Sequence, residues 1–159
     1  MADMKRLLIF LLCICMCITP ALASNKTSTY RWSGTEGTAG RMYYGTGSVA
    51  LYYGDSQSIT DAADSANYIT TYGTSAIIAD HNYQTGNAIK SLSVGDSIWI
   101  KRNGTVTRYE CTMVDYNGHN TGSAITDSNY NSLMNTGKIV FYTCNGNWTS
   151  VTVLIFERR

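Results

Sequence analysis

Short apolar stretches separated by polar turns dominate the chain after residue 40, and this pattern predicts β-strands. The continuous apolar run at 75–80 indicates a buried strand, and Asn-Gly pairs at 103–104, 117–118 and 145–146 mark turns. The pattern predicts strands over 41–53, 75–80, 97–101, 106–116, 138–143 and 151–157. At least six strands with little helix imply an all-β sandwich or barrel.

Three polar segments leave room for short helices. Residues 60–68 have space for one or two helical turns, and 84–92 carries Ala88, Ile89 and Leu92 on one side at helical spacing. The polar loop at 127–135 predicts a third short helix. The composition is rich in Tyr, Thr, Ser, Gly and Asn, with one proline, and it favours strands and turns over long helices.

The first 23 residues have the pattern of an export signal. Lys5 and Arg6 precede the apolar run 7–18, and the segment ends in Ala21 and Ala23, a small-x-small cleavage pattern. The run is too short to cross a ~30 Å hydrocarbon core unless residues 19–23 join it. We therefore expect an exported protein with a signal peptide or N-terminal membrane anchor at 1–23. A flexible polar arm at 24–40 and one domain at 41–159 follow.

The charge of the mature chain limits its partners. Without residues 1–23 it has ten basic and ten acidic residues, and no basic stripe runs along it. This balance argues against a nucleic-acid partner. Three of the five cysteines lie in the leader, so only Cys111 and Cys144 remain, too few for a disulfide scaffold.

His81 and Cys144 are the main candidates for chemistry. Each directly follows or ends an apolar strand, where rigid backbone holds the side chain at the mouth of the fold. A thiol beside an imidazole yields a nucleophile near neutral pH, because the imidazolium stabilises the thiolate. Taken separately, the histidine is also compatible with a surface role and the cysteine with a small buried side chain.

Three motifs in order resemble the sortase family. They are His81 after an apolar strand, Leu-Ser-Val-Gly-Asp at 92–96, and Tyr-Thr-Cys at 142–144 before the last strand. The similarity spans about residues 42–157. It implies a closed eight-stranded sortase-like β-barrel with one to three short helices, and a cysteine transpeptidase without metal or organic cofactor.

The resemblance also implies a mechanism. Cys144 would attack a threonine carbonyl in a C-terminal sorting motif of a cell-surface protein, forming an acyl-enzyme. His81 would protonate the leaving amine, and an acceptor amine from a cell-wall peptide or a pilin lysine would resolve the acyl-enzyme. Thr143 matches the residue that precedes the nucleophile and shapes the site.

The chain departs from the family at two points. Sortases place an arginine on the last strand to hold substrate and oxyanion, and here Ser150 or Thr152 stands at the expected position. The groups that offer a replacement are Asn145, Trp148, Ser150, His119 and Arg108. Asp80 stands where glycine commonly precedes the histidine, either beside the His81 ring or in solvent. The alternative function is a weak or inactive sortase-shaped domain that binds peptide or cell wall.

Other interpretations remain open. His119 also fits a solvated turn, and Cys111 fits a buried strand filler, a disulfide partner of Cys144, or a zinc ligand with His81, His119 and Cys144. Two other classes of cell-wall cysteine enzyme fit less well. Papain-like peptidases place cysteine before histidine, and the other peptidoglycan transpeptidases use a Ser-His-Gly-Cys step that this chain lacks.

Overall fold

The structure, a computed structural model, describes residues 32, 34–71 and 73–159. The predicted export segment 1–23 and much of the predicted arm 24–40 lie outside these residues. Within the described part of the arm, Ala39 is buried and Glu36 pairs with Lys101 at 3.4 Å. No helix in the described chain is long and apolar enough to cross a membrane.

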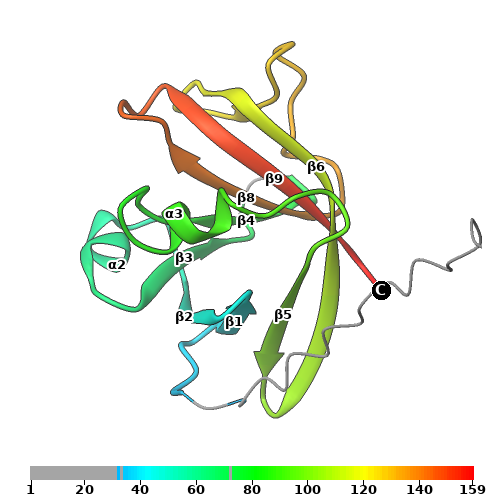
Figure 1. The fold of residues 1–159 in the computed structure, drawn as a ribbon. Coiled ribbons are helices and arrows are strands. Elements are labelled where there is room, and N and C mark those ends of the chain that lie inside the picture. The colour runs from blue at the N-terminus through cyan, green and yellow to red at the C-terminus, as the bar shows by residue number, and fades with distance from the viewer. Residues whose placement is uncertain (1–31, 33, 72) are drawn as a thin grey trace, which may run out of the picture.

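Eight strands form a closed barrel (Figure 1). The strands are β1 (Gly40–Tyr44), β2 (Gly47–Tyr53), β3 (Ser65–Ile69), β4 (Ala76–Ala79), β5 (Ser97–Arg102), β6 (Thr105–Asn120), β8 (Ile139–Cys144) and β9 (Ser150–Arg158). Their order is β5-β1-β2-β3-β4-β8-β9-β6, and the pairing of β5 with β6 closes the barrel. The short β7 (Ile125–Thr126) extends the sheet beyond the end of β6. The predicted eight-stranded barrel is confirmed.

Two of the strand pairs are parallel, β2 with β3 and β4 with β8, and the other pairs are antiparallel. A parallel pair needs a crossover, and α2 (Gln57–Asp61) lies in the crossover between β2 and β3. The second helix, α3 (Thr85–Ile89), lies between β4 and β5. Figure 1 shows both helices on the same side of the barrel.

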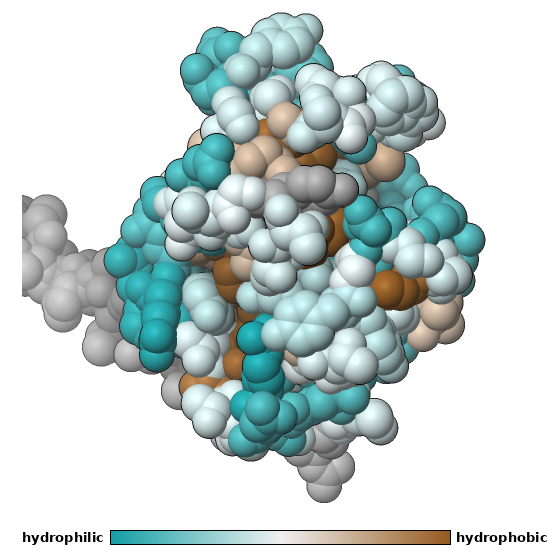
Figure 2. Space-filling model, turned by 180° about the vertical axis from the view of Figure 1, so that it is seen from behind, coloured by the Kyte–Doolittle hydropathy of each residue, from teal (hydrophilic) through white to brown (hydrophobic). Residues whose placement is uncertain are grey.

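Strands β4 and β8 are buried on both faces, which explains their continuous apolar sequences. On β8, Phe141 faces the barrel interior with Leu51, Ile78 and Leu154. Val140, on the opposite face, packs in a second cluster outside the barrel. That outer cluster is completed by Ile125, Leu133 and Met134 from the segment that connects β6 to β8. Over the face seen in Figure 2, polar side chains leave apolar atoms visible only in narrow strips.

Two of the predicted segments have a different structure. The predicted strand 41–53 is a hairpin of β1 and β2, because the chain turns at Gly45 with φ +46°. The predicted helical segment 60–68 contains strand β3, whose polar Ser65 and Asn67 are buried by pairing with β2 and β4. The strand was not predicted because its sequence is locally polar.

The helix predicted at 127–135 is wrong. Asp127 Oδ1 accepts the main-chain N–H groups of Asn129 at 2.9 Å and Asn131 at 2.8 Å, and Tyr130 has φ +63°. A side chain that satisfies nearby main-chain donors competes with helix formation, and this loop takes that alternative. Ser75 then ties the loop down by donating its hydroxyl to Leu133 O at 2.7 Å.

Replacing Phe141 by alanine is expected to lower the free energy of unfolding by about 3–5 kcal/mol, because the ring fills the barrel interior and is fully buried. Urea denaturation measures the loss. The matched control is Tyr116→Ala on the exposed part of β6, expected to change stability by about 0.5 kcal/mol or less. Equal losses in the two variants would contradict the described packing.

Candidate active site

The parallel pairing of β4 with β8 brings the two main candidates to the same edge of the barrel. Ala79 lies level with Tyr142 in this pair. His81 is two residues beyond Ala79, and Cys144 is two residues beyond Tyr142, so the register carries both to one level. Because side chains alternate along a strand, Cys144 shares the outer face with Tyr142, while Thr143 between them is fully buried.

The thiol of Cys144 is free and half-buried. The pKa of Cys144 is raised above its usual value. Burial is the largest cause, and the positive charge of Lys90 acts against it. On its other side Cys144 pairs with Val151 at the start of β9. The thiol is therefore held in a largely apolar setting with one cation acting on it.

Cys111 is also free. It lies on β6, opposite the far end of β9. It pairs with Phe156, five residues from the Val151 partner of Cys144, which separates the cysteines by about 16 Å along the strand. A disulfide needs Cα atoms within about 7 Å, so the two do not bridge here. Among the described residues, no three His, Cys, Asp or Glu side chains are grouped as a metal site would require.

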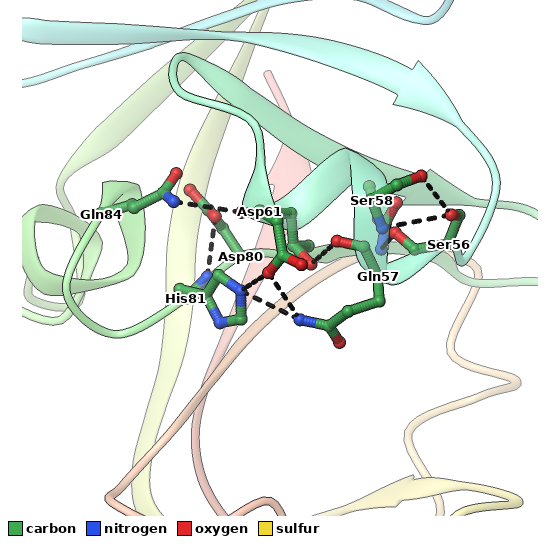
Figure 3. A network of polar contacts seen from close by, with 9 residues as sticks. Ser56, Gln57, Ser58, Asp61, Asp80, His81 and Gln84 are labelled. Carbon is green, nitrogen blue, oxygen red and sulfur yellow. Dashed lines mark hydrogen bonds and ion pairs between the residues drawn. The ribbon is translucent and has the colours of Figure 1, made fainter.

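The His81 ring points to α2, as Figure 3 shows. Its Nε2 donates to Asp61 Oδ1 at 2.8 Å, and Gln57 Nε2 donates to the same oxygen at 2.8 Å. The ring also stacks on Tyr83, with centroids 4.7 Å apart and planes at 14°. The hydrogen bond to His81 is the largest cause that lowers the pKa of Asp61. Asp61 and Gln57 lie twenty or more residues before the histidine, and no sequence motif predicted their contact with it.

Asp80 holds the backbone around His81. Its carboxylate is almost fully buried and accepts the main-chain N–H of His81 at 2.7 Å and that of Thr85 at 3.1 Å. The carboxylate thus fixes the start of α3 and the peptide of the histidine, and these contacts use main-chain groups. The pKa of Asp80 is raised, with burial as the largest cause, against the lowering effect of the Thr85 side chain and of these main-chain hydrogen bonds.

Gly86 allows α3 to lie directly on the end of β8. A Cβ at this position would collide with Thr143 Oγ1 and lie 2.6 Å from His81 O. The Gly86 N–H donates to that same oxygen at 3.1 Å. Thr143 Oγ1 is buried with no hydrogen-bond partner among the described groups. Only glycine permits this approach, which the sequence pattern did not single out.

The other candidates are distributed around the start of β9. His119 pairs with Ser150 and stacks on Tyr130, with centroids 4.1 Å apart. Ser150 is next to Val151, the partner of Cys144. The Asn145 amide donates to Tyr116 O at 2.8 Å and accepts from Thr152 Oγ1 at 2.7 Å, so both of its ends are engaged.

Arg108, the arginine among the replacement candidates, lies at the opposite end of the barrel. It follows the start of β6 and pairs with Glu110 at 3.6 Å. On β9, Arg158 faces Tyr109, which is also far from the Val151 end. Trp148, in the loop between β8 and β9, is exposed.

A groove of about 180 Å³ runs along the outer face that Cys144 shares. Ile77 and Tyr142 form part of its floor, Ala124 and Met134 come from the segment before β8, and Trp148 comes from the loop after it. The groove is mainly apolar, and neither Cys144 nor His81 is among the residues that line it.

No family model and no curated protein matches this chain. Solved structures do. Sortase A from Corynebacterium diphtheriae is 16% identical with a TM-score of 0.58, over 76% of this chain and 60% of that chain. Sortase A from Listeria monocytogenes is 15% identical with a TM-score of 0.58, over 76% and 86%. Sortase C from Clostridium perfringens, solved with the C-terminal cell wall sorting motif, is 16% identical with a TM-score of 0.53, over 76% and 70%.

Many of the similar structures are sortases, and each has low sequence identity to this chain. The described domain therefore has the sortase fold, as the sequence motifs indicated. The roles of His81, Cys144 and the supporting residues stay predictions.

Replacing Gly86 by alanine is expected to lower the free energy of unfolding by about 1–3 kcal/mol, because the new Cβ displaces α3 from Thr143 and His81 O. Chemical denaturation measures the change. Asn87→Ala, an exposed position on the same helix, is the control and is expected within about 0.5 kcal/mol of the unmodified protein. A Gly86→Ala protein as stable as this control would rule out the close contact.

Asp80 makes a specific contribution to the pH dependence of stability. Because its folded-state pKa is raised above 3.8, its contribution is greatest below 3.8 and is lost as pH rises through the folded-state pKa. Relative to Asp80→Asn, the unmodified protein is therefore expected to lose stability as pH rises above 3.8, with a plateau near neutrality. Urea denaturation over this range measures the difference.

Asp61→Asn serves as the opposite control. The pKa of Asp61 is lowered, so its contribution is present above 3.8 and is lost as pH falls below that value. Slopes of the same sign for both variants would contradict the assignment for Asp80.

Proposed function

We propose that this protein is an exported sortase-like cysteine transpeptidase that acts through Cys144 and His81. The observation that carries the proposal is the register of β4 and β8, which brings both residues to one edge of the barrel. An apolar groove lies on the outer face of these strands. The sortase fold supports it, because similar structures include a sortase solved with a sorting motif.

In the proposed reaction, the Cys144 thiolate bonds to the carbonyl carbon of a threonine in a C-terminal sorting motif. The peptide C–N bond then breaks, and His81 gives a proton to the leaving amine. This step produces a thioester. An acceptor amine, from a cell-wall peptide or a pilin lysine, attacks the thioester carbon, the C–S bond breaks to release the thiolate, and the proton lost by the amine returns to His81.

The hydrogen bond to Asp61 selects the tautomer of His81 that the proposed reaction needs. Asp61 accepts from Nε2, so the other ring nitrogen, Nδ1, is the one that serves the thiol. The carboxylate also stabilises the imidazolium that forms when the ring takes a proton. Asp61 therefore has the role of orienting the base.

A second candidate function is a domain that binds peptide or cell wall without turnover. The burial that raises the pKa of Cys144 favours it, because a neutral thiol is a poor nucleophile. In both cases the apolar pattern at 1–23 supports action outside the cytoplasm, on the cell surface or after secretion.

Incubation of the full chain, purified in mild detergent, with a panel of sorting-motif peptides is expected to give an acyl adduct on Cys144 by mass spectrometry. Cys144→Ala should abolish the adduct and Cys111→Ser should retain it. His81→Asn should slow its formation about 10²- to 10⁴-fold, because it removes the general acid–base. Peptide binding without any adduct would overturn the enzyme and favour the binding domain.

A further inference from the structure

Two adjoining cavities open at the end of the barrel away from Cys144. One, of about 510 Å³, lies where β8 begins and β9 ends, and the other, of about 290 Å³, lies where β5 ends and β6 begins. Tyr68 and Tyr109 line both cavities, while Arg158 lines the first and Arg102 the second. We call these four residues the tyrosine–arginine pocket. Its size is that of a small-molecule site.

The two arginines lie on the inward face of their strands. On β9, Arg158 is two residues beyond Phe156, which packs in the barrel core. On β5, Arg102 is two residues beyond Ile100 of the same core. Alternate side chains of a strand share a face, so both arginines continue the inward face past the apolar core. Guanidinium and phenol groups thus line this end of the barrel interior.

Contacts hold the Arg102 guanidinium in place. Its Cζ lies 5.0 Å from the ring centroid of Tyr68 and 5.5 Å from that of Tyr53. Its Nε donates to Ala39 O at 2.9 Å. A guanidinium has five N–H donors, and this hydrogen bond uses the one on Nε. The group is therefore oriented through its faces and its Nε, which leaves the terminal nitrogens to a ligand.

The positive charge of the pocket is not balanced by the residues around it. Glu157 is the one carboxylate among the described residues that line the two cavities, and it pairs with Lys138 at 2.7 Å. Within the part of the chain that the structure describes, no carboxylate lies at ion-pair distance from Arg102 or Arg158. Two uncompensated cations beside phenol hydroxyls favour an anionic ligand.

Tyr109 offers a hydrogen-bond donor to a ligand in either cavity. Its pKa is raised, with burial as the largest cause and Tyr68 adding to it, while Arg158 and Arg102 act against the shift. The hydroxyl therefore keeps its proton at neutral pH and is able to donate to an anion.

We propose that the tyrosine–arginine pocket binds the phosphate group of a small organic phosphate. A phosphate monoester carries about 1.5 to 2 negative charges at pH 7, which two guanidinium groups match better than they match a single carboxylate. Guanidinium groups bind phosphate oxygens through paired N–H donors, and the phenol hydroxyl of Tyr109 adds another donor. The inference goes beyond the proposed function, since this pocket lies at the other end of β8 from Cys144.

The test is isothermal titration calorimetry of the full chain in mild detergent and a phosphate-free buffer. The probes are glucose 6-phosphate, inorganic phosphate and glucose. We expect saturable binding of both phosphates and none of glucose. Arg158→Gln should weaken phosphate binding about 10- to 100-fold, because it removes a charge-assisted donor pair. Tyr109→Phe should weaken it about three- to tenfold through the loss of one hydroxyl.

Arg159→Gln is the matched control. It makes the same change of charge at the neighbouring residue, whose guanidinium pairs with Glu110 at 3.0 Å and lines neither cavity. This variant should bind phosphate as the unmodified protein does. The inference is overturned if neither phosphate binds saturably at millimolar concentration, if Arg158→Gln and Arg159→Gln weaken binding equally, or if glucose binds as tightly as glucose 6-phosphate. The assay needs no sorting peptide, so its outcome is independent of the transpeptidase proposal.

Discussion

The parallel pairing of β4 and β8 is the constraint on which the candidate site depends. A shift of one residue in this register would turn every side chain of β8 to the opposite face. Such a shift would place Cys144 in the barrel interior and Phe141 in the outer cluster, so the different packing on the two faces of the strand keeps the geometry of the site. The hydrophobic interior thus determines where the thiol lies, and the outer cluster keeps the groove-forming segment against the strand.

The predictable part of the fold was the part that long apolar patterns encode. Strands β4, β8 and β9 were recognisable because burial on both faces requires continuous apolar sequence. Strand β3 was not recognisable, since Ser65 and Asn67 are buried through sheet pairing and through a side-chain contact of Asn67 with Ser56 O. The helix expected at 127–135 failed because an aspartate side chain satisfied the local donors first.

The candidate site shows the same division. His81 and Cys144 could be proposed from the sequence because each stands at the end of an apolar run, a signal present in the local sequence. Asp61 was not found, because its contact with His81 is created by the crossover that carries α2. A charged partner that comes from a distant segment has no characteristic spacing from its partner in the sequence, so no sequence motif indicates the contact.

The peptide of His81 is held at both of its polar groups, its N–H by Asp80 and its C=O by Gly86. With the main chain fixed, the imidazole exchanges partners only by rotation about its own side-chain bonds. Such rotations take picoseconds to nanoseconds for accessible side chains, far faster than typical enzyme turnover. In the transpeptidation proposed for this protein, rotation of the His81 ring would therefore not limit the rate, and a slow step would belong to bond-making or to the arrival and departure of the substrates.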